Sequence, residues 1–110
     1  MLRYDGLYTC QQNGTVRCLR FFEADRLVLY LSTQDSVQQV AWLLTPDRDL
    51  AKGTYKIDGN HLSFSIFQGD VQIDFECELK DQELNCNTFS HYNGNRASCC
   101  YQFVAMELDK

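Results

Sequence analysis

The sequence has a single proline, no long run of like charges and no long apolar stretch. A membrane-spanning helix needs roughly 18 consecutive apolar residues, so we expect no membrane partner. The formal net charge of −5 repels a phosphate backbone, which argues against nucleic acid as a partner. The first residues lack the apolar run of a signal peptide, which favours a cytoplasmic protein, or a secreted one whose signal peptide was removed.

Motifs for catalysis are lacking too. The chain has no Gly-x-Ser-x-Gly turn and no phosphate-binding loop, and its two histidines, His61 and His91, are isolated. An isolated histidine beside a turn is more often a surface residue than a catalytic base. No Cys-x-x-Cys pair suggests a metal site. We therefore expect a protein that is not an enzyme and that uses no cofactor and no metal.

The chain does contain ample material for a core. Of its 110 residues, 45% are hydrophobic and 13% are aromatic, which suits one domain over residues 1–110. Short alternating segments separated by turn residues dominate, and this pattern is typical of antiparallel sheet.

Three turns in the second half of the chain predict one common register. Two-residue loops at residues 59–60, 69–70 and 81–82 connect four strands, and a slip of one residue in any hairpin would exchange the two faces of the sheet. The three turns agree on one dry and one wet face. The dry face has two aligned layers, the first made of Ile57, Leu62, Cys77 and Cys86, and the second of Tyr55, Phe64, Phe75 and Thr88.

The first half predicts three more strands, over residues 7–10, 17–23 and 27–31. The hairpin of residues 19–31 is apolar on both faces, so something should cover its outer face. A helix near residues 36–44 is the candidate, because Val37, Val40, Ala41 and Leu44 follow helical spacing and Asp35 or Ser36 can cap its start. A homodimer contact is the competing explanation.

A last strand, over residues 98–106, points Cys99, Tyr101, Phe103 and Ala105 inward. The total is eight strands and one short helix. An open sheet with so many apolar residues would expose an aggregation-prone edge strand, and closing the sheet into a barrel removes that edge. The sequence thus predicts an all-β fold, a single eight-stranded antiparallel up-and-down barrel whose interior is filled or holds one small ligand.

Short motifs in this chain resemble those of the lipocalin-like (calycin-type) barrels. Gly6-Leu7-Tyr8 resembles the lipocalin Gly-x-Trp signature, with tyrosine in place of tryptophan. Residues 16–22 with 27–30, and residues 53–55 with 59–62, look like two hairpins of the lipocalin-like domain that follows the F-box in one class of F-box proteins. The resemblance implies a barrel fold and, since such folds often bind apolar small molecules, a ligand of that kind.

The chain departs from that pattern in three ways. Arg26 replaces the usual glycine of the second hairpin, no basic residue that closes the barrel base can be assigned, and no F-box is present. Membership of a ubiquitin ligase is therefore not implied.

The six cysteines allow two interpretations. They can be thiols packed as small core residues, which a reducing compartment favours. Alternatively, Cys77 and Cys86 face each other across two strands, and Cys10 and Cys18 flank the first hairpin, so Cys10–Cys18 and Cys77–Cys86 could be structural disulfides. Cys99 and Cys100 are adjacent and point to opposite faces.

Two functions stay open. The first is a non-enzymatic barrel that binds a small apolar or amphipathic ligand. The second is an interaction module with a packed barrel, which would act through the two-sided hairpin or through the acidic face of Asp74, Glu76 and Glu78, otherwise interpreted as solubility and strand-edge protection. Six residues converge on the barrel axis as the candidate ligand site: Tyr8, Tyr55, Phe64, Phe75, Tyr101 and Phe103.

Overall fold

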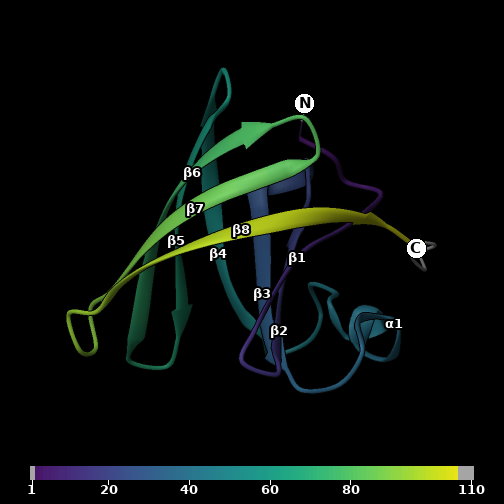
Figure 1. Cartoon of the computed structure of the whole chain (residues 1–110), viewed down its shortest axis with the longest axis horizontal. Coiled ribbons are helices and arrows are strands. Elements are labelled where there is room, and N and C mark those ends of the chain that lie inside the picture. The colour runs from purple at the N-terminus through teal and green to yellow at the C-terminus, as the bar shows by residue number, and fades with distance from the viewer. Residues whose placement is uncertain (1, 107–110) are drawn as a thin grey trace.

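Eight antiparallel strands close into one barrel in the computed structural model, which describes residues 2–106 and their side chains except that of Val40. Each strand pairs with the next along the chain, and β8 pairs with β1 to close the barrel (Figure 1). The predicted up-and-down barrel is confirmed. The strands are β1 Gly6–Gln12, β2 Thr15–Phe21, β3 Leu27–Thr33, β4 Ala51–Asp58, β5 His61–Gln68, β6 Val71–Lys80, β7 Glu83–Ser90 and β8 Arg96–Ala105.

The register predicted for β4 to β7 is confirmed at every predicted pair. Phe64 faces Tyr55 on β4 and Phe75 on β6. The turns permit this register because Gly59 and Gly69 take φ values of 61° and 59°, in the left-handed region where glycine meets no steric penalty.

The connection from β2 to β3 is longer than predicted. β2 ends at Phe21 rather than at residue 23, and the 3₁₀ turn η1 (Ala24–Arg26) follows. The backbone N–H of Phe22 donates to the carbonyl of Leu27 at 2.8 Å, which closes the turn. Arg26 takes φ 52°, a left-handed conformation that explains why a glycine would suit this position.

A short helical segment covers the outer face of β1 to β3, as predicted. It consists of α1 (Val37–Val40) and η2 (Ala41–Leu43), and Figure 1 shows it outside the barrel. Ser36 is the N-cap, and its backbone N–H donates to Gln39 Oε1 at 3.1 Å. The side chain of Val40 lies outside those that the structure describes. Buried together on this face are Leu7, Val16, Cys18, Leu29, Ala41 and Leu44.

This covering bears on the homodimer hypothesis. The apolar outer face of the hairpin of residues 19–31 is buried by the chain itself, so the exposed patch that suggested a dimer contact is absent from the described residues. Between residues 2 and 106, no helix has the length and apolar character to cross a membrane.

A disulfide joins Cys10 on β1 to Cys99 on β8 across the seam where the barrel closes. The interpretation of the cysteines as free thiols is therefore wrong for Cys10 and Cys99, whereas Cys77 and Cys86 are free. The alternative Cys10–Cys18 bond is wrong. The first hairpin has no bulge, so Cys10 pairs with Arg17 and Thr9 pairs with Cys18. Cys10 therefore points into the barrel while Cys18 points outward, under the helical segment.

The prediction that Cys99 and Tyr101 point inward is confirmed, since both are buried in the barrel core. Phe103 packs half-buried against the same core. Ala105 is exposed, because it pairs with Gly6 at the rim, where the barrel ends.

Candidate functional site

The aromatic residues predicted to line a ligand site mostly fill the barrel instead. Tyr8, Tyr55 and Phe64 are each at most 5% exposed. Phe21 presses edge-on against all three, with ring centroids 5.4 to 5.7 Å apart. Phe75 stacks on Phe64 at 4.7 Å. Close packing of this kind leaves no room for a ligand in that part of the interior.

The end of the barrel nearer the N-terminus is also closed. The backbone N–H of Arg3 donates to the Tyr8 hydroxyl at 3.0 Å, and the Tyr55 hydroxyl donates to the carbonyl of Phe22 at 2.9 Å. The Arg3 guanidinium lies 4.5 Å from the centroid of the Phe103 ring. The phenols at this end thus have partners within the protein, and a basic side chain, which the sequence did not let us assign, helps to close it.

A pocket of about 260 Å³ lies at the opposite end. The loop between β7 and β8 and the β1–β2 and β5–β6 hairpins gather there (Figure 1). The volume falls just below the range of about 300–1,000 Å³ that is usual for drug-sized ligands. The lining residues come from five strands and one loop, and they are Arg17, Tyr30, Ile73, Phe75, Thr88, Ser90, Asn93, Asn95, Ala97 and Tyr101.

The pocket exists because the inward positions of β7 and β8 become small at this end. Thr88 pairs with Phe75 on one side and with Ala97 on the other. Neither Thr88 nor Ala97 is large enough to fill the layer, so the Phe75 ring is left as part of the pocket wall. The result is an apolar inner wall with a polar rim.

One charged side chain lines this pocket. Arg17 follows the alternation of β2 that buries Leu19 and Phe21, so it points into the barrel, and it is half-buried. Burial raises the pKa of the Tyr30 phenol, and the positive charge of Arg17 partly offsets this. Burial also raises the pKa of Tyr101, again opposed by Arg17. The guanidinium therefore acts electrostatically on both phenols, and both remain protonated at neutral pH.

Of the six predicted site residues, the structure brings Phe75 and Tyr101 to this pocket. Arg17 was not predicted, although the β2 alternation was a sufficient signal, because the residue two positions before inward Leu19 must also face inward. Thr88 was predicted to point inward. A small polar residue in a layer of aromatic rings indicates that the side chains do not fill the barrel interior at that level. Asn93 and Asn95 lie in a loop, where no periodicity could have indicated their direction.

The polar groups on the outer face do not form a catalytic triad. Asp74 accepts a hydrogen bond from Ser65 at 2.6 Å and pairs with His91 at 2.6 Å. Hydrogen bonds from Ser65, His91 and Gln72 lower the pKa of Asp74 to about 2. The carboxylate stands between the serine and the imidazole, whereas nucleophilic catalysis needs the imidazole beside the hydroxyl.

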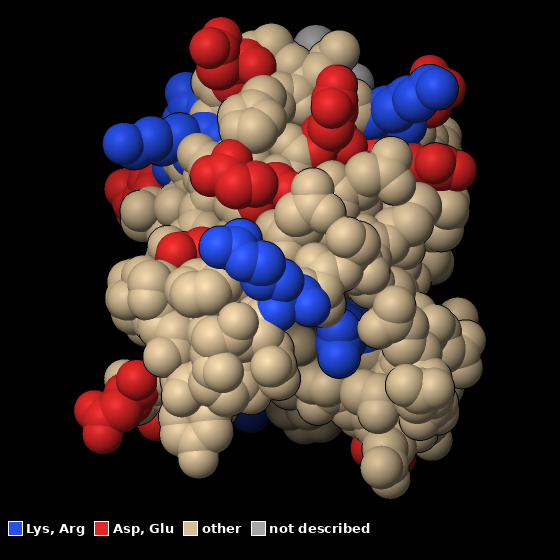
Figure 2. All heavy atoms as spheres, turned by 60° about the vertical axis from the view of Figure 1, so that its left-hand side comes forward, with Lys and Arg blue, Asp and Glu red and all other residues tan. Residues whose placement is uncertain are grey.

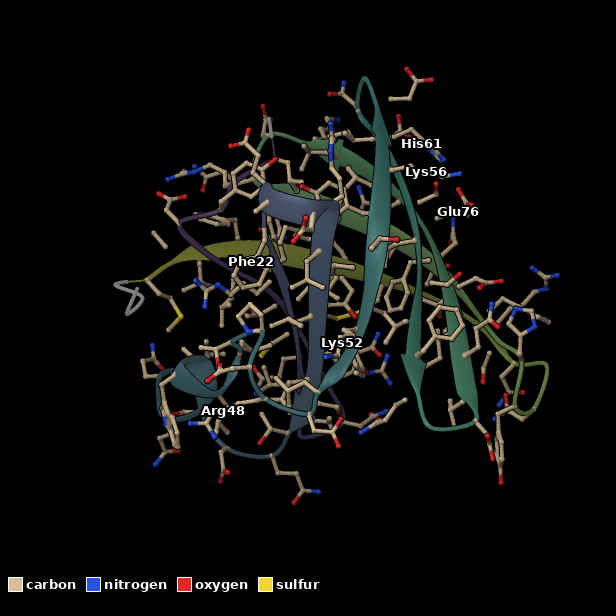
Figure 3. The ribbon with its side chains drawn as sticks, turned by 180° about the vertical axis from the view of Figure 1, so that it is seen from behind. Phe22, Arg48, Lys52, Lys56, His61 and Glu76 are labelled. Carbon is tan, nitrogen blue, oxygen red and sulfur yellow. A yellow bond between two sulfur atoms is a disulfide. The ribbon has the colours of Figure 1, made fainter. Side chains whose placement is uncertain are left out.

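His61 pairs with Glu76 at 2.7 Å, and Lys56 lies beside them on the outer face (Figure 3). Basic and acidic side chains are mixed on the side of the molecule that Figure 2 brings forward.

The interpretation of the acidic residues Asp74, Glu76 and Glu78 as strand-edge protection is wrong, since β6 has a strand on each side. A shallow groove of about 450 Å³ runs here, with both signs of charge in its lining.

Comparison of the chain with protein family models, with curated proteins and with solved structures found no match. The class that the structure defines is the closed, eight-stranded antiparallel barrel with a pocket at one end.

Proposed function

We propose that this protein is a non-enzymatic, lipocalin-like barrel that binds a small amphipathic molecule in the pocket at the end remote from the N-terminus. The observation that supports the proposal most is the chemical division of that pocket. Ile73, Phe75 and Tyr101 offer an apolar inner wall, and Ser90 and the loop asparagines offer polar groups at the rim. A concave apolar site with a few convergent polar groups is the usual form of a small-molecule site.

The packing below the pocket limits the size of the ligand. Phe75 is part of the pocket wall, and Phe64 stacks directly behind it at 4.7 Å. A ligand cannot pass these rings without displacing a packed core, which is costly. We therefore expect a molecule with a short tail that inserts at the open end and leaves its polar group near the rim.

The alternative, an interaction module with a ligand-free barrel, has less support. Its first surface, the two-sided hairpin, is covered by the helical segment. Its second surface, the acidic face, is interrupted by basic side chains and by two histidine–carboxylate pairs. Neither surface is uniformly apolar or uniformly charged, as a surface that recognises one kind of partner would be.

Binding of a short amphiphile, followed by NMR shifts of the backbone amides, tests the proposal. We expect octanoate or 1-octanol to shift the amides of Ile73, Phe75 and Tyr101. Thr88→Trp should abolish these shifts, because the indole fills the pocket. Asn87→Trp is the matched control, since it places the same ring on the outer face of β7. No shifts in the wild-type protein with any amphiphile, or equal binding by Thr88→Trp, would contradict the proposal.

A further inference from the structure

We propose that Arg17 makes the end pocket selective for a ligand with an anionic head group, in particular a carboxylate on a short apolar tail. This inference rests on the proposed function and extends it by naming the class of ligand.

The charge inside the pocket is opposite to that of the whole protein. The chain has a formal net charge of −5, yet Arg17 is the one charged residue among the ten that line the pocket. The guanidinium group of arginine is positively charged in proteins. The pocket therefore has a permanent positive charge, held in a site partly shielded from water, where a charge acts more strongly than in bulk solvent.

Arg17 is also the one arginine that has, within residues 2–106, no partner of the kinds that the other arginines have. Arg3 pairs with Asp5 at 2.6 Å, and Arg20 donates to the carbonyl of Leu44 at 2.7 Å. The other arginines lie over aromatic rings, Arg26 over Tyr55, Arg48 over Trp42 and Arg96 over Phe89. No ion pair, hydrogen bond or ring contact of this kind joins the Arg17 guanidinium to another residue between 2 and 106.

The guanidinium of Arg17 is half-buried, and none of its nitrogen atoms is shut off from water, so an anion that enters the pocket can reach them. An anion that enters the pocket would supply the missing partner. The planar fork of arginine matches the two oxygens of a carboxylate, and such paired, charge-assisted hydrogen bonds are among the strongest in proteins. The phenols of Tyr30 and Tyr101, which line the same pocket and stay protonated, are available as further hydrogen-bond donors.

The guanidinium and the apolar wall come from different strands. Arg17 lies on β2, whereas Ile73 and Phe75 lie on β6, and the Tyr30 ring on β3 reaches across the barrel to within 6.1 Å of the Phe75 ring. A carboxylate bound at Arg17 leaves its tail free to lie against Tyr30 and the apolar side chains of β6.

Three ligands with the same eight-carbon tail isolate the effect of charge. We expect the wild-type protein to bind octanoate about tenfold or more tightly than 1-octanol, and to bind octylammonium most weakly, by titration calorimetry. Arg17→Gln should reduce octanoate affinity by about tenfold and leave 1-octanol binding unchanged. Arg96→Gln is the matched control, because it removes the same charge from an exposed position at the same end of the barrel.

The outcomes separate this inference from the proposed function. Equal affinity for the three ligands in the wild-type protein, or an octanoate affinity that Arg17→Gln does not change, would overturn the inference while the pocket keeps its function. Absence of binding by all three would overturn both. The comparison of the ligands on the wild-type protein needs no variant, so the inference stays testable even where Arg17→Gln fails to fold.

Discussion

Cys77 and Cys86 face each other across β6 and β7 as free thiols whose sulfur atoms lie 2.7 Å apart. This separation is only slightly longer than a covalent S–S bond of about 2.05 Å. The sequence placed the two residues directly opposite, and the structure holds them buried in the barrel core.

Mild oxidation should therefore join Cys77 to Cys86 without a change of fold. The hydrogen bond with Cys86 and burial raise the pKa of the Cys77 thiol, so little thiolate forms and the reaction is slow. Mass spectrometry of alkylated protein, before and after a reductant, checks this outcome. Exposed Cys100 is the internal control and should be alkylated first. Oxidised protein in which Cys77 and Cys86 stay alkylatable after unfolding would contradict the prediction.

Loss of the Cys10–Cys99 bond should lower the free energy of unfolding substantially. The two residues are 89 positions apart, and closing a loop of that length stabilises the folded state by about 3–5 kcal/mol, mainly through the unfolded chain. Urea unfolding of a Cys10→Ser, Cys99→Ser double variant measures the loss. Cys100→Ser, an exposed free cysteine on the same strand, should change the stability by less than about 0.5 kcal/mol. Equal free energies of unfolding for the two variants would show that the Cys10–Cys99 bond does not stabilise the pairing of β1 with β8.

Asp74→Asn should destabilise the barrel slightly at neutral pH. The group is partly exposed, so the expected loss is about 1 kcal/mol or less. The pKa of Asp74 is lowered to about 2 in the folded protein, below about 3.9 in an unfolded chain. Its contribution is therefore fully present above pH 4 and is lost as the pH falls towards 2. Unfolding free energies of variant and wild type should converge over that window. Glu78→Gln, on the same strand, is the control, and a difference that persists at pH 2 would contradict the assignment.

Leu44→Ala should test the helical segment as a cover for the barrel. Leu44 is fully buried against the outer face of β1 to β3, and Arg20 donates a hydrogen bond to its carbonyl. Truncation of a buried leucine costs about 2–4 kcal/mol. Trp42→Ala, two residues away and 57% exposed, should cost less than about 1 kcal/mol by thermal or urea unfolding. Similar losses for the two variants would mean that the segment does not cover this face in solution.

The sequence predicts the register of β4 to β7 because two-residue turns and alternating side chains both constrain it. Phe64, for example, can meet Tyr55 and Phe75 in only one way once the turns at Gly59 and Gly69 are placed. The bond between Cys10 and Cys99 escapes such reasoning. Those residues lie on the first and last strands, and no turn fixes the register of that pair.

The position of the pocket could be predicted in part from the sequence, whereas the chemistry of its lining could be predicted less well. Rings at alternate positions indicate a core, but whether they fill it depends on volumes across the barrel rather than along one strand. The small pair of Thr88 and Ala97 opens the space, and it becomes visible only when the β7–β8 register is known. Sequence spacing also cannot show that, within residues 2–106, no carboxylate pairs with Arg17, because this depends on the three-dimensional arrangement.

The disulfide at the seam also determines how the molecule would respond to a mechanical load. Because Cys10 and Cys99 are covalently joined, residues 10–99 form a closed ring that contains almost the whole barrel. A force applied at the two ends of the chain passes through that bond and extends only the short segments outside the ring. The four pocket strands β2, β3, β6 and β7 lie wholly within the ring and are shielded from tension for as long as the bond is intact, whereas Tyr101 on β8 lies outside it.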